Sequence, residues 1–187
     1  MNGLTVDTDG CLRPGTSAED LAGLKLAFDE NGSVTAGTSS PLTDGAAATL
    51  VCSEAYAQKN GLEPIARIKS IAVSGCNPET MGLGPIFASR KALDRAELSA
   101  DAIDVVEINE AFATQSIASV RDLGLNIDKV NIDGGAIAIG HPLGATGARI
   151  TGKAAQILKR EDGRYALSTQ CIGGGQGIAT VMETVGV

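Results

Sequence analysis

Apolar residues recur along the chain with two different periods, which predict strands alternating with helices. Short runs rich in β-branched residues predict strands at 65–75, 102–109, 164–171 and 177–185, and a short extended piece at 130–135. Helical periods predict helices at 84–96, at 110–124 and after the glycine-rich residues 134–147. Because strands and helices alternate, we expect an α/β fold with a mixed sheet covered by helices.

The last of these helices has a clear amphipathic pattern. Its apolar positions fall on one side of the helix, and its charged and polar positions fall on the other. The side chains expected to face inward are Ile150, Ala154, Ile157 and Leu158. Those expected to face outward are Arg149, Lys153, Gln156 and Arg160.

The first 60 residues are less regular. A short helix is expected within 14–28, and the polar, turn-rich residues 30–45 predict a loop. Asp44 is expected to cap a helix that runs to about Asn60. The apolar residues that share one face of this expected helix are Ala47, Leu50, Val51 and Ala55.

Length, composition and charge limit the possible classes of protein. The 187 residues, 43% of them hydrophobic, are enough for one domain with a sizeable core. A net charge of −7 without a basic run argues against nucleic acid as a partner. No apolar stretch reaches the length of a membrane span, and the first residues lack the pattern of a signal peptide. A cytoplasmic location is therefore expected.

The four cysteines do not have the spacing of metal ligands or of a disulfide framework. We therefore expect no metal site, and free thiols in a reducing compartment. The cysteines are Cys11, Cys52, Cys76 and Cys171.

One glycine-rich segment holds the only histidine of the chain, His141. Three glycines around it, Gly140, Gly144 and Gly147, permit positive φ and the close approach of another group. A histidine on such a rigid turn is a candidate base, and a solvated or structural histidine is the alternative. The nearby "GARITGKA" has Ala154 where a phosphate-binding loop needs Ser or Thr, which excludes that motif.

Two further positions carry candidate chemistry. Cys171 ends a predicted strand and precedes three glycines whose amides form a candidate nest for an oxyanion. Asn109 ends the predicted buried strand, a frequent place for site residues in α/β sheets. The structural alternatives are a buried cysteine beside a tight turn and an asparagine that caps a helix.

Together and in this order, these segments resemble the signatures of the thiolase family. They are "NEAF" (109–112), "GGAIAIGHPLGATGARI" (134–150) and "CIGGGQG" (171–177). Two more segments match the family as well, "VTAGTSSPLTDGAAA" (34–48) and "GCNPETMGLGPIFASRKAL" (75–93). Within the family the chain is most similar to acetyl-CoA acetyltransferases and to the 3-ketoacyl-CoA thiolases of fatty-acid metabolism.

The resemblance implies roles for individual residues. His141 would deprotonate a nucleophilic cysteine and, with a water held by Asn109, form one oxyanion hole. Cys171 would act as the second acid and base, and the amide of Gly173 would belong to the other oxyanion hole. The residues expected to contact coenzyme A or to line its pantetheine and acyl channel are Arg13, Ser40, Met81 and Phe112.

The implied reaction transfers acyl groups between CoA thioesters. In the degradative direction a cysteine attacks the 3-keto carbon, acetyl-CoA leaves, and the acyl group passes to free CoA. The reverse reaction is a Claisen condensation, whose enolate needs hydrogen bonds to its oxygen. Coenzyme A would be a substrate, and no permanently bound cofactor is expected.

The sequence departs from the family in length. Thiolases are roughly twice as long, and their amino-terminal half carries the nucleophilic cysteine. The resemblance thus implies the carboxy-terminal half of an αβαβα sandwich, with a five-stranded sheet and helices on both faces. Residues 1–43 would be a remnant of the CoA-binding loop domain, and 44–187 the carboxy-terminal domain.

Three explanations of the missing half stand side by side. In the first, the chain would be one subunit of a split thiolase. In the second, it would be a shortened thiolase or the product of a truncated gene. In the third, it would be a CoA-thioester binding or scaffold protein without turnover. We favour the first, because His141, Cys171 and Asn109 are all present. An exposed apolar face would then lead the chain to pair with a second polypeptide or with itself.

Overall fold

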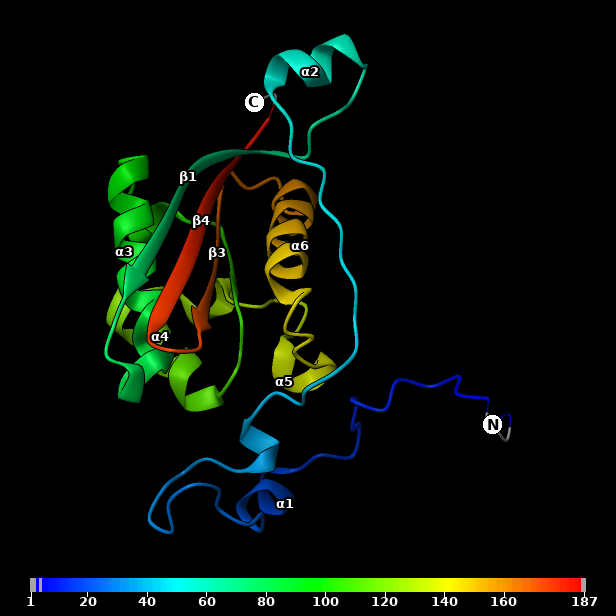
Figure 1. Ribbon diagram of the computed structural model, residues 1–187, viewed down its shortest axis with the longest axis vertical. Helices are drawn as coiled ribbons and strands as arrows, with labels where there is room; N and C mark the ends of the chain where they lie inside the picture. The colour runs from blue at the N-terminus through cyan, green and yellow to red at the C-terminus, as the bar shows by residue number, and fades with distance from the viewer. Residues whose placement is uncertain (1–2, 4, 186–187) are drawn as a thin grey trace.

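The computed structural model describes residues 3 and 5–185, and within them four strands form one mixed sheet (Figure 1). The strands are β1 (Ala66–Gly75), β2 (Val105–Ile108), β3 (Tyr165–Ile172) and β4 (Gln176–Thr184). Their order across the sheet is β1-β4-β3-β2. The pairs β1–β4 and β4–β3 are antiparallel, and β3–β2 is parallel, so the carboxyl ends of β2 and β3 lie at one edge.

The helices are α1 (Ala18–Ala22), α2 (Glu54–Lys59), α3 (Gly84–Ala96), α4 (Ala113–Leu123), α5 (Ala136–Ile139) and α6 (Thr146–Arg160). Short 3-10 helices lie at η1 (Ala36–Thr38), η2 (Pro78–Leu83), η3 (Ala100–Ala102) and η4 (Ile127–Lys129). Among the described residues, no helix combines the length and the apolar character that crossing a membrane requires.

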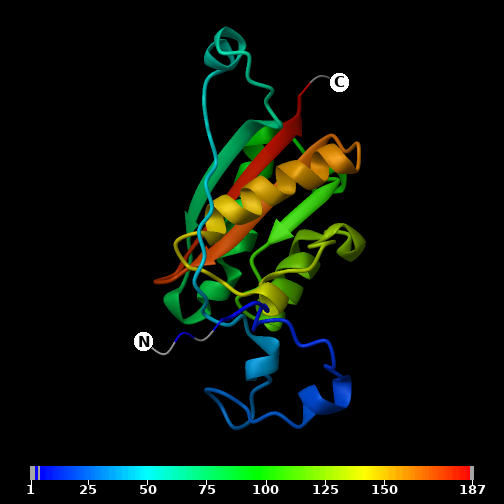
Figure 2. The same cartoon turned by 90° about the vertical axis from the view of Figure 1, so that its right-hand side faces the viewer.

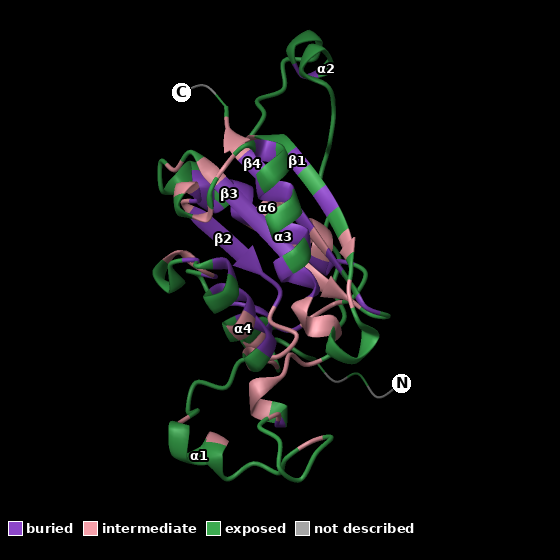
Figure 3. Ribbon diagram, turned by 90° about the vertical axis from the view of Figure 1, so that its left-hand side faces the viewer, coloured by how far each residue is buried: buried purple, intermediate pink, exposed green. Residues whose placement is uncertain are grey.

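The sheet separates two cores of different size. Helices α3 and α4 cover one face, and α6 lies against the other (Figure 1). The larger core lies between the sheet, α3 and α4, and it includes Ile103, Val106, Leu123 and Leu167. The smaller core lies under α6 and includes Val105, Ile157 and Leu158. Burial is therefore concentrated in the sheet and on the inner sides of these helices, as Figure 3 shows.

The amino-terminal part of the chain lies outside these layers. Residues 5–35, with α1, form an excursion beyond the end of the sheet (Figures 1 and 2). Residues 43–53 then run extended beside α6 to α2 at the opposite end of the molecule. Thr49 lies next to Gly152 of α6, and Pro142 lies against Gly45. This segment thus follows the outer side of α6 along its length.

Most elements of the layered part agree with the sequence-based prediction. The helix at 84–96 has the bounds expected, and α4 ends at Gly124, which has φ 66°. Ile150, Ala154, Ile157 and Leu158 of α6 are all buried, as their spacing predicted. Two residues expected to face outward are instead half-buried, Arg149 and Lys153, because a buried carboxylate lies beneath them.

Two expectations about secondary structure are wrong. The helix expected between Asp44 and Asn60 forms only at Glu54–Lys59, after Ser53, whose side chain caps it. The preceding residues are extended, and a short apolar run does not distinguish a strand from a helix by its period. The expected fifth strand is reduced to a single bridge between Val106 and Val130, since the chain turns at Asn131 with φ 47°.

Candidate active site

His141 lies in the turn between α5 and α6, and its backbone is held in place by the amino-terminal loop. Its amide donates to the carbonyl of Pro41 at 2.9 Å, and it forms a parallel bridge with Leu42. Gly140, directly before it, has φ 93°, and a Cβ there would collide with the side chain of Thr43. A glycine is therefore required next to the histidine for two independent reasons.

The other two glycines of this segment have ordinary backbone conformations, contrary to expectation. Neither Gly144 nor Gly147 has a positive φ. Gly147 lies in the first turn of α6, where a Cβ would come within 3.4 Å of the amide nitrogen of Gln170. That distance is an ordinary van der Waals contact with the side chain of Gln170, so α6 packs next to the end of β3 without requiring a glycine here.

The imidazole of His141 is half-buried and bonded on one side. Its Nδ1 lies 2.7 Å from the hydroxyl of Thr146, a residue with no solvent exposure. Burial lowers the pKa of His141, and the positive charge of Arg149 lowers it further. The ring is therefore neutral at neutral pH, which is the form that accepts a proton.

Asn109 lies directly after β2, where its amide donates to the carbonyl of Thr169 at 3.0 Å. The side chain is buried, and neither amide atom has a hydrogen-bond partner among the described residues. The cap position of α4 belongs to Phe112, so the helix-capping alternative for Asn109 does not apply. A buried amide without a partner is costly unless a water or ligand satisfies it.

Residues 39–42 place Ser40 and Phe112 beside each other. The amide and the hydroxyl of Ser40 both donate to the carbonyl of Ala111, at 3.1 and 3.4 Å. Ser39 forms an antiparallel bridge with Phe112. The loop that holds His141 therefore also contacts the "NEAF" segment.

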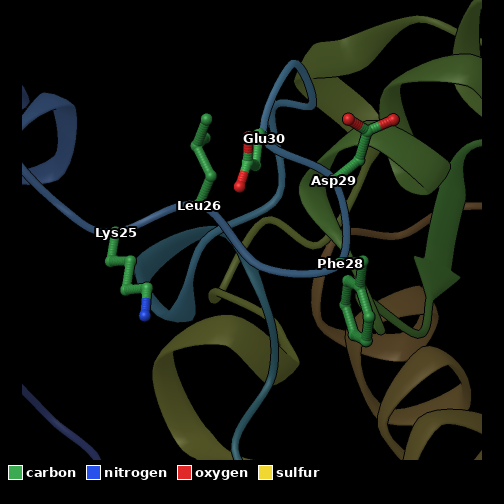
Figure 4. A pocket seen from close by; sticks show the side chains of 5 residues that line it. All are labelled: Lys25, Leu26, Phe28, Asp29 and Glu30. Carbon is green, nitrogen blue, oxygen red and sulfur yellow. The ribbon is translucent and has the colours of Figure 1, made fainter.

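Phe28 also lies in this region, which no sequence pattern predicted. Its ring packs edge-to-face on Phe112, with ring centroids 6.4 Å apart. It is highly exposed and has φ 70°, which is unusual for a bulky residue. A hollow of about 350 Å³ lies beside it, as Figure 4 shows. The residues that line this hollow are Lys25, Leu26, Phe28, Asp29 and Glu30.

Cys171 lies near the end of β3 and is half-buried. Burial raises the pKa of its thiol, its own amide lowers it, and Cys76 raises it again, with a net rise. The thiol is therefore protonated at neutral pH and able to act as an acid. The turn that follows has φ 85° at Gly174 and 88° at Gly175, while Gly173 has open space around it.

Cys76 connects Cys171 to Met81, a contact that the sequence did not predict. Its amide donates to the carbonyl of Gly175 at 2.8 Å, which fixes it against the turn after β3. Its sulfur lies 3.9 Å from the carbonyl oxygen of Met81 in η2. Met81 therefore belongs to the surroundings of the thiol pair.

Arg13 is placed differently from the other expected residues. It lies exposed on the amino-terminal excursion, and its guanidinium donates to the carbonyl of Cys11 at 3.4 Å. Asn109 and Cys171 lie where β2 and β3 end, and His141 lies shortly before α6 begins. The 39–42 loop contacts His141 through Pro41 and the residues after Asn109 through Ala111. Gly147 of α6 lies next to Gln170, the residue before Cys171.

Comparison with known proteins shows the family of the chain. The model of the thiolase C-terminal domain matches residues 62–184, and that of the thiolase N-terminal domain matches residues 1–55. The chain is 56% identical over 183 residues to a 3-ketoacyl-CoA thiolase of Cronobacter sakazakii, covering 96% of this chain and 47% of the relative. A 3-ketoacyl-CoA thiolase of Alcanivorax borkumensis is 54% identical over 183 residues, again with 96% and 47% covered.

Solved structures show the same relation. Human mitochondrial 3-ketoacyl-CoA thiolase in complex with CoA superposes with a TM-score of 0.89 and 45% identity, covering 97% of this chain and 46% of the human chain. The acetyl-CoA acetyltransferase of Bacillus anthracis gives a TM-score of 0.91 at 45% identity, covering 95% and 45%. The chain thus spans about half the length of the relatives it matches. By sequence and by fold, it belongs to the thiolase family.

Proposed function

We propose that the chain supplies the acid–base and oxyanion groups of a thiolase that transfers acyl groups between CoA thioesters. The proposal rests on one observation. Asn109, whose buried side-chain amide has no partner among the described residues, follows β2, and Cys171, with its protonated thiol, lies near the end of the neighbouring strand β3. The neutral imidazole of His141 lies in the turn before α6. Such a set accepts one proton, donates another and binds a water or an oxygen.

In this proposal His141 takes the proton of a nucleophilic cysteine, and Cys171 exchanges a proton with the methyl carbon of acetyl-CoA. A water held by Asn109 and the amide of Gly173 stabilise the oxyanions. The human relative in complex with CoA supports coenzyme A as the substrate. Ser40 and Phe112 are proposed to contact it. Arg13 is proposed to contact the CoA nucleotide.

We further propose that the nucleophilic cysteine lies outside residues 1–187, in an amino-terminal thiolase half that packs against them. The chain covers 47% of its relatives, and the amino-terminal family model matches residues 1–55 alone. Residues 43–52 form no backbone hydrogen bond within the described chain and expose Leu50 and Val51. An extended segment with free amides and carbonyls fits the edge of a sheet from the missing half.

The test measures thiolysis of acetoacetyl-CoA by free CoA. The chain is mixed with the amino-terminal half of the Cronobacter sakazakii relative, with each half alone as a reference. We expect turnover only in the mixture, with a loss of about 100-fold or more in His141→Ala and in Cys171→Ala. Lys159→Ala, an exposed position on α6, serves as the control and keeps full activity. A mixture that forms a complex but lacks turnover favours a CoA-thioester binding protein instead.

A further inference from the structure

The hydroxyl of Thr146 has two hydrogen-bond partners that together fix the proton of the His141 ring. It lies 2.7 Å from Nδ1 of His141 and 3.0 Å from the carbonyl oxygen of Pro142. A hydroxyl carries a single proton, and a carbonyl only accepts. When this proton goes to Pro142, the hydroxyl oxygen accepts from the ring, so Nδ1 carries the hydrogen and Nε2 keeps its lone pair.

The surroundings leave this hydroxyl little freedom. Thr146 has no solvent exposure, and its amide also donates to Pro142 at 2.9 Å, as expected at the start of a helix. Its hydroxyl bond to the residue four positions earlier is the usual one for Thr in a helix. The backbone of His141 is pinned to Pro41 at 2.9 Å. Both ends of the Nδ1–hydroxyl contact are therefore rigid.

We propose that Thr146 is a positioning residue that holds His141 in the Nδ1-protonated tautomer and directs Nε2 toward the reacting atoms. The catalytic part of this inference rests on the proposed function, whereas the tautomer itself does not. When Nε2 takes a proton from a thiol, the ring becomes a cation with a hydrogen on each nitrogen. The bond from Nδ1 to Thr146 is unchanged in that step, so the ring does not need to reorient.

A neutral partner differs from a carboxylate partner in its effect on the base. A carboxylate on Nδ1 stabilises the charged ring and raises its pKa, whereas a buried hydroxyl orients the ring without adding charge. The lowered pKa of His141 agrees with the neutral partner. Thr146 therefore orients the imidazole ring of His141 without stabilising its charged form.

The tautomer is measured by nitrogen-15 NMR of the imidazole, which is unambiguous because the chain has one histidine. Three forms of the whole chain are compared: wild type, Thr146→Ser, which keeps the hydroxyl, and Thr146→Val, which keeps the branched shape. We expect a protonated Nδ1 and a bare Nε2 in the first two. In Thr146→Val we expect the Nε2-protonated tautomer that free imidazole side chains prefer in water.

Two results overturn the inference: an Nε2-protonated ring in the wild type, or a Thr146→Val ring with the wild-type tautomer. The wild-type measurement is decisive by itself if Thr146→Val fails to fold. In the mixed-half thiolysis assay, kcat is expected to fall at least 10-fold in Thr146→Val, with a smaller change in KM, and to recover in Thr146→Ser. Because the NMR readout needs no turnover, failure of the tautomer and failure of the proposed function are separate outcomes.

Discussion

The pKa values of His141 and Cys171 are displaced in opposite directions, and both displacements leave the side chain uncharged at neutral pH. Burial is the largest cause in each case, since it disfavours the imidazolium and the thiolate alike. Nearby charge adds to it, from Arg149 for the histidine and from Cys76 for the cysteine. The proposed proton transfers need this uncharged base and this uncharged acid at their start.

The raised pKa of Cys171 predicts slow alkylation at moderate pH. Iodoacetamide reacts with the thiolate, so its rate at Cys171 is expected to rise with pH through an inflection above the ordinary thiol value of about 9. Mass spectrometry separates this rate from that of exposed Cys52. In Cys76→Ala the inflection moves down, because a neighbour that raises the pKa is removed. An inflection at Cys171 below 9 contradicts the structure.

Among the secondary-structure elements, α3 and β4 approach each other through two glycines. A Cβ on Gly177 would collide with the carbonyl of Gly84, and one on Gly84 would collide with the backbone of Gln176. No side-chain rotation relieves a clash with backbone. The packing of α3 on the sheet therefore depends on the absence of two methyl groups.

Gly177→Ala is expected to lower the unfolding free energy by about 2 kcal/mol or more, because the helix must shift from the strand. Gly152→Ala is the matched control within α6, where the nearest atom to a new Cβ is 3.8 Å away. Gly152→Ala is expected to raise the unfolding free energy by about 0.5–1 kcal/mol, because Ala is favoured over Gly in a helix interior. Urea unfolding measures both, and equal effects of the two substitutions are incompatible with the close approach.

The contact between β2 and α6 contains a buried charge. Glu107 is 3% exposed in its side chain and lies 3.4 Å from Lys153, which also donates to the carbonyl of Gly134. Burial raises the pKa of Glu107 to about 7, and this effect exceeds the lowering by Lys153. The ion pair therefore compensates only part of the cost of burying the carboxylate.

This carboxylate predicts a pH-dependent stability. Between about pH 4.5 and 7 the folded chain keeps a proton that the unfolded chain releases, so stability falls as pH rises through this window. Glu107→Gln removes this dependence on pH. Its unfolding free energy is expected to exceed that of the wild type by roughly 3 kcal/mol at pH 8, and by a smaller amount at pH 5. Urea unfolding at both pH values measures it, with exposed Glu161→Gln as the control. A difference that is the same at pH 5 and 8 refutes the buried charge.

At the scale of the whole molecule, residues 43–53 stand out because their apolar side chains and backbone are largely left exposed by the rest of the chain. Leu50 and Val51 are 73% and 67% exposed, and the backbone of 43–52 has no hydrogen-bond partner within the described residues. Extended backbone with apolar side chains is the kind of surface that pairs with another chain. Self-association is therefore expected whenever the proposed amino-terminal half is absent.

Size-exclusion chromatography with light scattering checks this expectation. Alone, the chain is expected to elute as dimers or larger species, and addition of the Cronobacter sakazakii half should replace them with a one-to-one complex. Val51→Lys is expected to weaken both associations at least 10-fold. Ile127→Lys, an equally exposed apolar position on η4, is the control and should have no effect. A well-dispersed monomer that ignores the added half contradicts the proposal.

The sequence by itself determined the layered fold and its family. The helix at 84–96, the strand around Val105 and the inward residues of α6 follow from local periods and turn residues, because each element buries one face. The positions of His141 and Cys171 were visible because glycine-rich turns mark them. The family motifs are long and continuous, and no tertiary information was needed to find them.

Only the tertiary structure decided the rest, since it depends on contacts between distant residues. Residues 43–53 run extended beside α6, although their apolar spacing also suits a helix. Phe28 reaches Phe112 across 84 positions of sequence, which no local pattern records. The partner of the His141 ring is a hydroxyl five residues away, and its role depends on the geometry of one helix turn. The spacing of apolar residues along the chain predicts which side chains are buried. The nitrogen of His141 that carries the proton depends instead on atoms that only the folded chain brings together.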